Sequence, residues 1–212
     1  MTFSAELRRA ADPIWQAQHD HPFVRGIGDG TVDVGRFKRW LRQDYRFLVE
    51  YCRVFALAAA RSPDLSTLRK FAELLEATAV TEMDLHRSYA ADFGISPGEL
   101  EAEEMAPVTR AYTDFLVRTA ATADFAELAA AVLPCMWGFN EIGLRLAERG
   151  RPADARCAAW IDAYADPAFT ELAGWCRELV DGLAAEAGPG VRARMREAFL
   201  ASSRYELAFW DV

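Results

Sequence analysis

The sequence predicts an all-α fold, a single-domain helical bundle that spans residues 1–212. Composition is the first reason, because 39 Ala and 20 Leu favour helices while only 12 Val and 5 Ile favour strands. Length is the second, since 212 residues correspond to one domain of ordinary size. A hydrophobic fraction of 52% is the third, because it supplies a core and is inconsistent with disorder.

Charge and cysteine content exclude several classes of protein. A net charge of −8 argues against sequence-independent nucleic-acid binding, which depends on Lys and Arg contacts to phosphates. The four cysteines lack Cys-x-x-Cys spacing and are too few for a secreted disulfide scaffold. The charged N-terminus does not resemble a signal peptide, and the uncharged stretch 128–140 is too short to cross a bilayer. We therefore expect a cytoplasmic protein without nucleic-acid or membrane partners.

Proline and capping residues place the first helices. An opening helix is expected over residues 3–18, with Pro13 as a kink or a restart. A loop with three glycines is expected to follow over residues 21–30. Asp33 suits the N-cap of a long helix that reaches Arg61.

The rest of the chain continues in the same way. Ser66 could cap the next helix, which Gly94 ends. The run Ser96-Pro97-Gly98-Glu99 has capping-box spacing, with proline at the first helical position. Further helices are expected at about 107–122, 125–148, 153–164, 167–187 and 190–210. The prediction is a bundle of about eight helices.

Two acidic residues and a thiol interrupt otherwise apolar helix faces. Asp44 lies in the apolar stripe of the long helix, and Glu206 lies in that of the last helix. Cys135 lies on the apolar face of its helix beside Pro134, which should interrupt the hydrogen-bond ladder there. Tyr112 lies on the apolar face of the helix near residue 107.

Each of these residues also has a purely structural interpretation. A cysteine on an apolar stripe is most often a small core residue, and a buried carboxylate often pairs with arginine. Two acids, one thiol and several aromatic rings on inward faces together indicate a polar pocket in the core. In such a pocket a thiolate can attack a substrate while carboxylates move protons. Periodicity does not reveal whether these side chains meet.

Glu82 and His86 are four residues apart and share a helix face. The nearby Glu73, Glu76 and Asp84 raise the alternative of a metal site. A di-iron bundle, however, uses two Glu-x-x-His elements with further glutamates, whereas this chain has one Glu-x-x-x-His pair and three histidines. We therefore expect a buried structural hydrogen bond here, and no metal or other cofactor.

A series of motifs resembles the TenA/thiaminase II proteins, in order and at family-like spacing. The motifs are His21-Pro22-Phe23-Val24, Gly26-Ile27-Gly28-Asp29-Gly30-Thr31, Phe37 with Gln43-Asp44, Glu82 through His86, Leu133-Pro134-Cys135-Met136-Trp137, Glu141-Ile142-Gly143, and Ser202-Ser203 through Tyr205-Glu206 with Phe209-Trp210. They cover nearly the whole chain. The combination is specific, although no single motif would be.

The resemblance implies an all-helical, haem-oxygenase-like fold without haem, commonly assembled as a homotetramer. It also implies an enzyme that hydrolyses small aminopyrimidines. The substrate would be thiamin or aminomethyl-pyrimidine, a product of thiamin breakdown. The product would be hydroxymethylpyrimidine, which such enzymes recover for thiamin synthesis.

The resemblance also assigns roles to individual residues. Cys135 would be the nucleophile that adds to the pyrimidine, and Glu206 would donate protons to the ring and the leaving group. Asp44 and Tyr164 would bind the pyrimidine nitrogens, and Tyr112 would line the pocket. A flat ring with nitrogens and an exocyclic amine needs donors, acceptors and aromatic walls.

Two expected substrate-binding positions depart from the family pattern. Family members often have Tyr at position 47, where its hydroxyl assists the nucleophilic cysteine, and this chain has Phe47. Position 139 is often a substrate-contacting Tyr, and here it is Phe139. Both changes keep the ring and remove a hydroxyl, so stacking can persist while thiol activation and one hydrogen bond are lost. We expect weaker or altered activity.

Three other functions remain as alternatives. The two lost hydroxyls leave room for a non-catalytic pyrimidine-binding or regulatory protein. A DNA-binding regulator fits poorly with the charge of −8 and the lack of a basic recognition helix. A metal oxidase on the same helical scaffold would contain bound iron.

Overall fold

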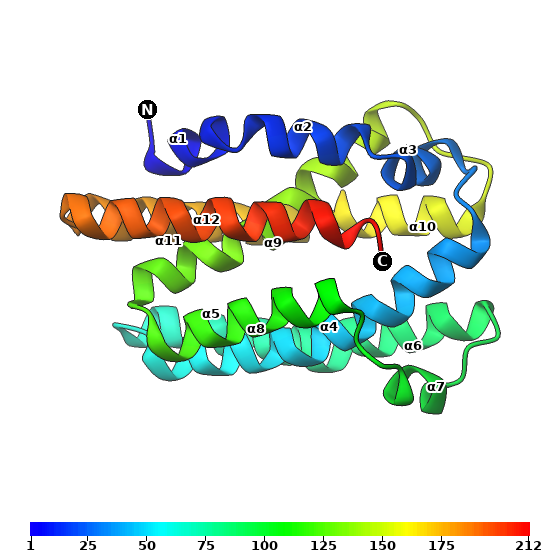
Figure 1. Cartoon of the computed structure of the whole chain (residues 1–212), viewed down its shortest axis with the longest axis horizontal. Helices are drawn as coiled ribbons and strands as arrows, with labels where there is room; N and C mark the ends of the chain where they lie inside the picture. Colours follow the sequence, from blue (N-terminus) through cyan, green and yellow to red (C-terminus); the bar gives the residue numbers. More distant parts are fainter. The chain divides into compact units, whose positions relative to one another are not determined.

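The computed structural model describes the backbone of all 212 residues and every side chain except those of Thr81 and Leu85. Figure 1 shows the helices in chain order, and no strand occurs in this described backbone. The helices are α1 (Phe3–Ala10), α2 (Asp12–Asp20), α3 (Pro22–Asp29), α4 (Val34–Arg61), α5 (Leu65–Glu76), the π-helix η1 (Ala77–Glu82), α6 (Met83–Asp92), α7 (Pro97–Ala102), α8 (Pro107–Thr122), α9 (Phe125–Glu148), α10 (Ala155–Tyr164), α11 (Pro167–Glu186) and α12 (Pro189–Phe209). The predicted all-α class is confirmed.

The chain divides into two compact units. The terminal unit comprises Met1–Asp33 and Ala126–Asp211, and the central unit comprises Val34–Phe125 with Val212. The single-domain organisation of residues 1–212 stays a prediction.

Helix α4 organises the central unit. Helices α5 and α8 pack against it, as Figure 1 shows. Its buried side chains recur every three or four residues, and they include Phe37, Leu41, Leu48 and Phe55. This is the period of an amphipathic helix, so one face of α4 supplies the core of this unit.

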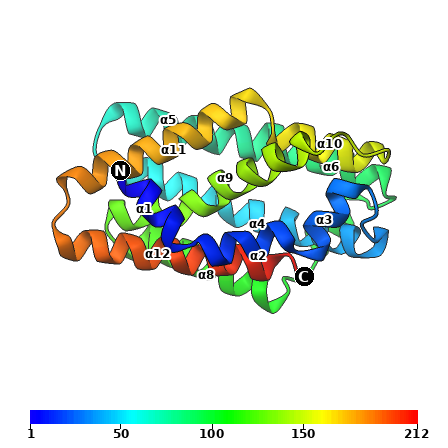
Figure 2. The same cartoon turned by 90° about the horizontal axis from the view of Figure 1, so that it is seen from above.

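The terminal unit is built around helices from both ends of the chain. Helix α2 lies alongside α12, which both Figure 1 and Figure 2 show, while α1 contacts α11 and α12, and α3 contacts α10. Trp15 of α2 is 1% exposed and stacks on Phe199 of α12, with ring centroids 6.0 Å apart. Its indole nitrogen donates a hydrogen bond to Ser203 Oγ at 3.0 Å. An aromatic anchor with its polar atom satisfied therefore joins α2 to α12.

Most predicted helices are confirmed. The expected helices over 107–122 and 125–148 coincide with α8 and α9, and α4 ends at Arg61 as expected. Pro13 marks a restart, since it lies in the first turn of α2. Ser96 and Glu99 form the predicted capping box at the start of α7. The expected number of about eight helices is too low, because two expected segments are divided and an expected loop is helical.

The expected loop over residues 21–30 is wrong, since helix α3 occupies Pro22–Asp29. His21 caps this helix by accepting a hydrogen bond from the Phe23 amide, and Pro22 takes the first helical position. Gly30 ends it in a left-handed conformation, with φ of 69°. Tertiary packing and good caps outweigh the weak helix propensity of glycine here.

The segment expected as one helix from Ser66 to Gly94 is three elements. Its N-cap is Asp64, whose carboxylate accepts a hydrogen bond from the Thr67 amide at 2.9 Å, and not Ser66. A π-helical stretch, Ala77–Glu82, then separates α5 from α6. Such a stretch has no composition signal of its own, so the sequence did not predict it.

Candidate functional site

The central unit contains three of the predicted substrate-binding residues. Asp44 and Phe47 are three residues apart on α4, so they share a helix face, and each is 4% exposed. The ring of Tyr112 on α8 lies 5.1 Å from that of Phe47, measured between centroids. The ring of Tyr51, also on α4, stacks on that of Phe47 with centroids 5.2 Å apart. A buried carboxylate and a group of flat rings therefore occupy one face of α4.

The carboxylate of Asp44 has a buried partner on α6. Nε2 of His86 lies 2.7 Å from Oδ2 of Asp44, and both side chains are buried. The predicted buried hydrogen bond of His86 is confirmed, but its side-chain partner is Asp44. Periodicity within one helix could not indicate this contact, because 42 residues separate the two side chains.

In the terminal unit, α9 and α12 carry the predicted catalytic residues. Cys135 is half-buried on α9, and Glu206 is 2% exposed on α12. Phe139 follows Cys135 by four residues, and Trp210 follows Glu206 by four, so each pair occupies one helix face. The rings of Phe139 and Trp210 lie 5.2 Å apart between centroids. The thiol and the carboxyl thus each lie one turn before a member of the same ring pair.

Helices α9 and α12 run in the same direction. Glu127 forms an ion pair with Arg194 near the start of both helices, and the Phe139–Trp210 contact occurs further along both. The thiol of α9 and the carboxyl of α12 lie between these two contacts in sequence. Helix α9 continues through Pro134, so the proline removes one ladder hydrogen bond without ending the helix.

Two aromatic rings of α10 lie next to the Phe139–Trp210 contact. The Phe139 ring lies 4.9 Å from that of Tyr164, so two predicted substrate-binding residues are together. Trp160 joins them, with its centroid 4.5 Å from Tyr164 and 6.1 Å from Phe139. Sequence reasoning did not select Trp160, although its four-residue spacing from Tyr164 on α10 was a usable signal.

Two residues of α9 fix the position of Tyr164. A Cβ atom at Gly143 would lie 2.6 Å from the backbone carbonyl carbon of Tyr164, so only glycine permits this approach. Nδ2 of Asn140 donates hydrogen bonds to the Tyr164 carbonyl oxygen at 3.0 Å and to Thr170 Oγ1 at 2.9 Å. The end of α10 is therefore held directly against α9.

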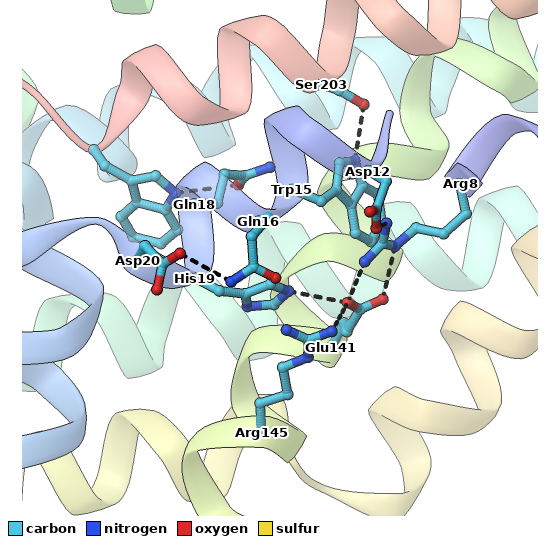
Figure 3. Close-up of polar contacts among 11 residues, drawn as sticks. Arg8, Asp12, Trp15, Gln16, Gln18, His19, Asp20, Glu141, Arg145 and Ser203 are labelled. Atoms are coloured by element: carbon cyan, nitrogen blue, oxygen red, sulfur yellow. Dashed lines mark hydrogen bonds and ion pairs between the residues drawn. The ribbon is translucent and has the colours of Figure 1, made fainter. Parts of the chain in front are cut away.

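Glu141, also on α9, contacts two arginines and a histidine (Figure 3). Arg8 donates to both carboxylate oxygens, from Nε at 3.0 Å and from Nη2 at 2.7 Å. His19 Nε2 lies 2.9 Å from Oε1, and Arg145 Nη2 lies 3.3 Å from it. Partial burial raises the pKa of this carboxyl, but hydrogen bonds from His19 and Arg8 outweigh that effect and hold the pKa at about 2.

Neither a metal cluster nor a membrane span is found in the described part of the chain. No group of three or more His, Cys, Asp and Glu side chains among these residues is arranged to hold a metal ion. None of the described helices combines the length and the apolar character that a bilayer crossing requires.

Comparison with known proteins decides the family. A family model described as TENA/THI-4/PQQC matches residues 8–212. The chain belongs to this family. The resemblance to TenA proteins in the sequence is thereby confirmed.

Known proteins match this chain over nearly its whole length. A Halalkalibacterium halodurans protein named aminopyrimidine aminohydrolase is 43% identical over 215 residues, which cover 100% of this chain and 95% of the relative. A TenA homologue from P. horikoshii has a TM-score of 0.93 at 26% identity, covering 100% of this chain and 97% of that one. A Shewanella denitrificans domain with a haem-oxygenase-like fold has a TM-score of 0.76 at 14% identity, covering 98% and 90%. The predicted haem-oxygenase-like fold is confirmed.

Thiol environments distinguish the cysteines of this TENA/THI-4/PQQC family member. Burial and the nearby Asp154 raise the pKa of Cys157 to about 11, and burial with Glu82 raises that of Cys52. A raised pKa leaves less thiolate at neutral pH and so a weaker nucleophile. Cys176 is buried, whereas Cys135 is half-buried. These environments leave Cys135 as the best candidate for a reactive thiol.

Proposed function

We propose that this protein is an aminopyrimidine aminohydrolase of the thiaminase II type. The observation that carries the proposal is the match, over the full chain, to a 43% identical relative with that name. Its substrate would be aminomethyl-pyrimidine or thiamin, and its product hydroxymethylpyrimidine, for use in thiamin salvage. The buried acids, the half-buried thiol and the aromatic rings supply the kinds of group that such a reaction needs.

In the proposed reaction, Cys135 and Glu206 carry the chemistry. The thiolate of Cys135 adds to the pyrimidine ring while Glu206 donates a proton to a ring nitrogen, and the ring electrons then expel ammonia, or the neutral thiazole of thiamin, from the exocyclic carbon. Glu206 takes the proton that the ring amine releases in this step and donates it to the departing amine. Water adds to the exocyclic carbon, and cleavage of the carbon–sulfur bond regenerates the thiolate and gives the alcohol.

The remaining predicted residues bind the ring. Asp44 accepts hydrogen bonds from the pyrimidine amine, and Tyr164 contacts a ring nitrogen through its hydroxyl. Tyr112, Phe47 and Phe139 supply flat apolar surfaces for the heterocycle. We further propose that the protein acts in the cytoplasm as a homotetramer, without a cofactor or nucleic-acid partner.

Product release from purified protein tests this function. The protein is incubated separately with aminomethyl-pyrimidine and thiamin, and hydroxymethylpyrimidine is quantified by chromatography. We expect catalytic release from at least one of them. Tight binding of hydroxymethylpyrimidine by calorimetry, with no turnover of either compound, would instead favour a non-catalytic pyrimidine-binding protein.

Restoring the hydroxyl at position 47 should increase turnover. Phe47 is buried beside Tyr112 and Tyr51, so a tyrosine ring keeps the same stacking partners. In family members this hydroxyl assists the thiol. The net free energy of one typical hydrogen bond, if it is gained in the transition state, corresponds to about a tenfold gain in kcat. Steady-state kinetics of Phe47→Tyr on aminomethyl-pyrimidine measures it, with Phe139→Tyr compared in parallel. An unchanged kcat for the Phe47 variant would contradict this role.

A further inference from the structure

The buried pair of His86 and Asp44 joins α6 to α4 within the central unit. The nitrogen and oxygen atoms are 2.7 Å apart, a length typical of a charge-assisted hydrogen bond. Both side chains are largely withdrawn from water, at 10% and 6% side-chain exposure. A buried charge without a partner is costly, so the carboxylate of Asp44 stabilises the charged form of the His86 ring.

The electrostatic environment of His86 favours its charged form. Burial lowers the pKa of His86, but the hydrogen bond to Asp44, the charges of Asp44 and Glu82 and the nearby backbone of Glu82 outweigh this and raise it. The imidazolium form donates to the Asp44 carboxylate, and this contact holds the ring in one orientation.

The backbone before His86 is unusual. The π-helical segment Ala77–Glu82 ends at Glu82, and α6 begins at the next residue, Met83. Stretches of π-helix within α-helices are rare and occur often at functional sites. The histidine that holds Asp44 therefore follows directly on a local change of helical register.

We propose that His86 is a positioning residue that holds one oxygen of the Asp44 carboxylate and thereby directs the other oxygen towards the substrate amine. This inference rests on the proposed function, in which Asp44 binds the pyrimidine. The ring nitrogen of His86 contacts Oδ2, so Oδ1 is the oxygen that this arrangement directs to a hydrogen bond from the substrate amine. Removing the histidine would allow the carboxylate to rotate, which would weaken the contact to an amine donor.

The pair itself is tested without any activity measurement. The chain contains three histidines, His19, His21 and His86, so each imidazole can be followed by NMR in histidine-labelled protein. The His86→Gln variant assigns the signal by its loss. We expect His86 to titrate above the ordinary histidine range, and to titrate at lower pH in Asp44→Asn. A His86 titration that Asp44→Asn leaves unchanged would overturn the pairing.

The positioning role is tested by kinetics on aminomethyl-pyrimidine. We expect KM of His86→Ala to rise about tenfold, because a hydrogen bond to a charged group is lost, with a smaller change in kcat. His86→Gln keeps a donor and should recover part of the loss. His21→Gln, which alters a histidine paired with Asp211 in the terminal unit, serves as control.

The outcomes separate the two proposals. If the NMR titration confirms the His86–Asp44 pair in the wild type but KM is unchanged in both His86 variants, the positioning role is overturned and the proposed function still stands. Wild-type protein that neither binds nor converts pyrimidines would contradict the proposed function and with it the substrate contact of Asp44. The NMR titration still decides the His86–Asp44 pair in that case. Thermal unfolding of each variant shows whether it is folded.

Discussion

Replacing Cys135 with serine is expected to reduce turnover of aminomethyl-pyrimidine at least about a thousandfold. The proposed reaction needs an anionic sulfur at neutral pH, and a serine hydroxyl remains almost fully protonated there. The replacement is nearly isosteric on a half-buried position of α9, so binding of hydroxymethylpyrimidine should persist. Steady-state kinetics measures turnover, and calorimetry measures binding.

Cys52→Ser is the matched control, because Cys52 is also half-buried in a long helix. It should retain wild-type turnover. Alkylation with iodoacetamide, mapped by mass spectrometry, should modify Cys135 fastest, since raised pKa values slow Cys52 and Cys157. Activity that survives in Cys135→Ser would refute its assignment as the nucleophile.

Capping residues and prolines in the sequence predicted the ends of several helices. Helix α7 begins with a serine cap and a proline, and α8 and α9 match their expected ranges. The error at α3 has a physical cause, because its glycines have low helix propensity but permit close packing. At Gly26, for example, a Cβ atom would lie 2.9 Å from the Cα of Val32. Helix propensity takes no account of such a contact between two parts of the chain.

The candidate site was likewise only partly predictable from the sequence. Asp44 and Glu206 were identified because a carboxylate on an apolar stripe is costly, and both are buried as that reasoning requires. Their partners could not be found in this way, because a contact such as His86 to Asp44 depends on how two helices pack. The π-helix before His86 and the contacts of Glu141 with Arg8 and His19 depend on packing as well. Sequence patterns thus indicated which residues are unusual, and the structure shows what several of them contact.

Glu141→Gln is expected to lower the free energy of unfolding at pH 7 by about 2–3 kcal/mol. The carboxylate has 19% side-chain exposure and binds Arg8, His19 and Arg145, so the neutral amide leaves the two arginines without their shared anion. The contacts join α1 and α2 to α9, the helix that carries Cys135. Urea unfolding followed by circular dichroism measures the change. Glu148→Gln, at an exposed position of the same helix, should alter stability little.

The pH dependence of this effect has a defined sign. The pKa of Glu141 is about 2 in the folded protein against an ordinary value of 4.5, so between these values the unfolded chain binds more protons. The contribution of Glu141 is therefore fully present above about pH 5 and is lost as pH falls towards 2. The difference in unfolding free energy between wild type and Glu141→Gln should narrow accordingly from pH 7 to pH 3. A difference that stays constant over this range would show that shape, and not the charge of the carboxylate, accounts for the loss.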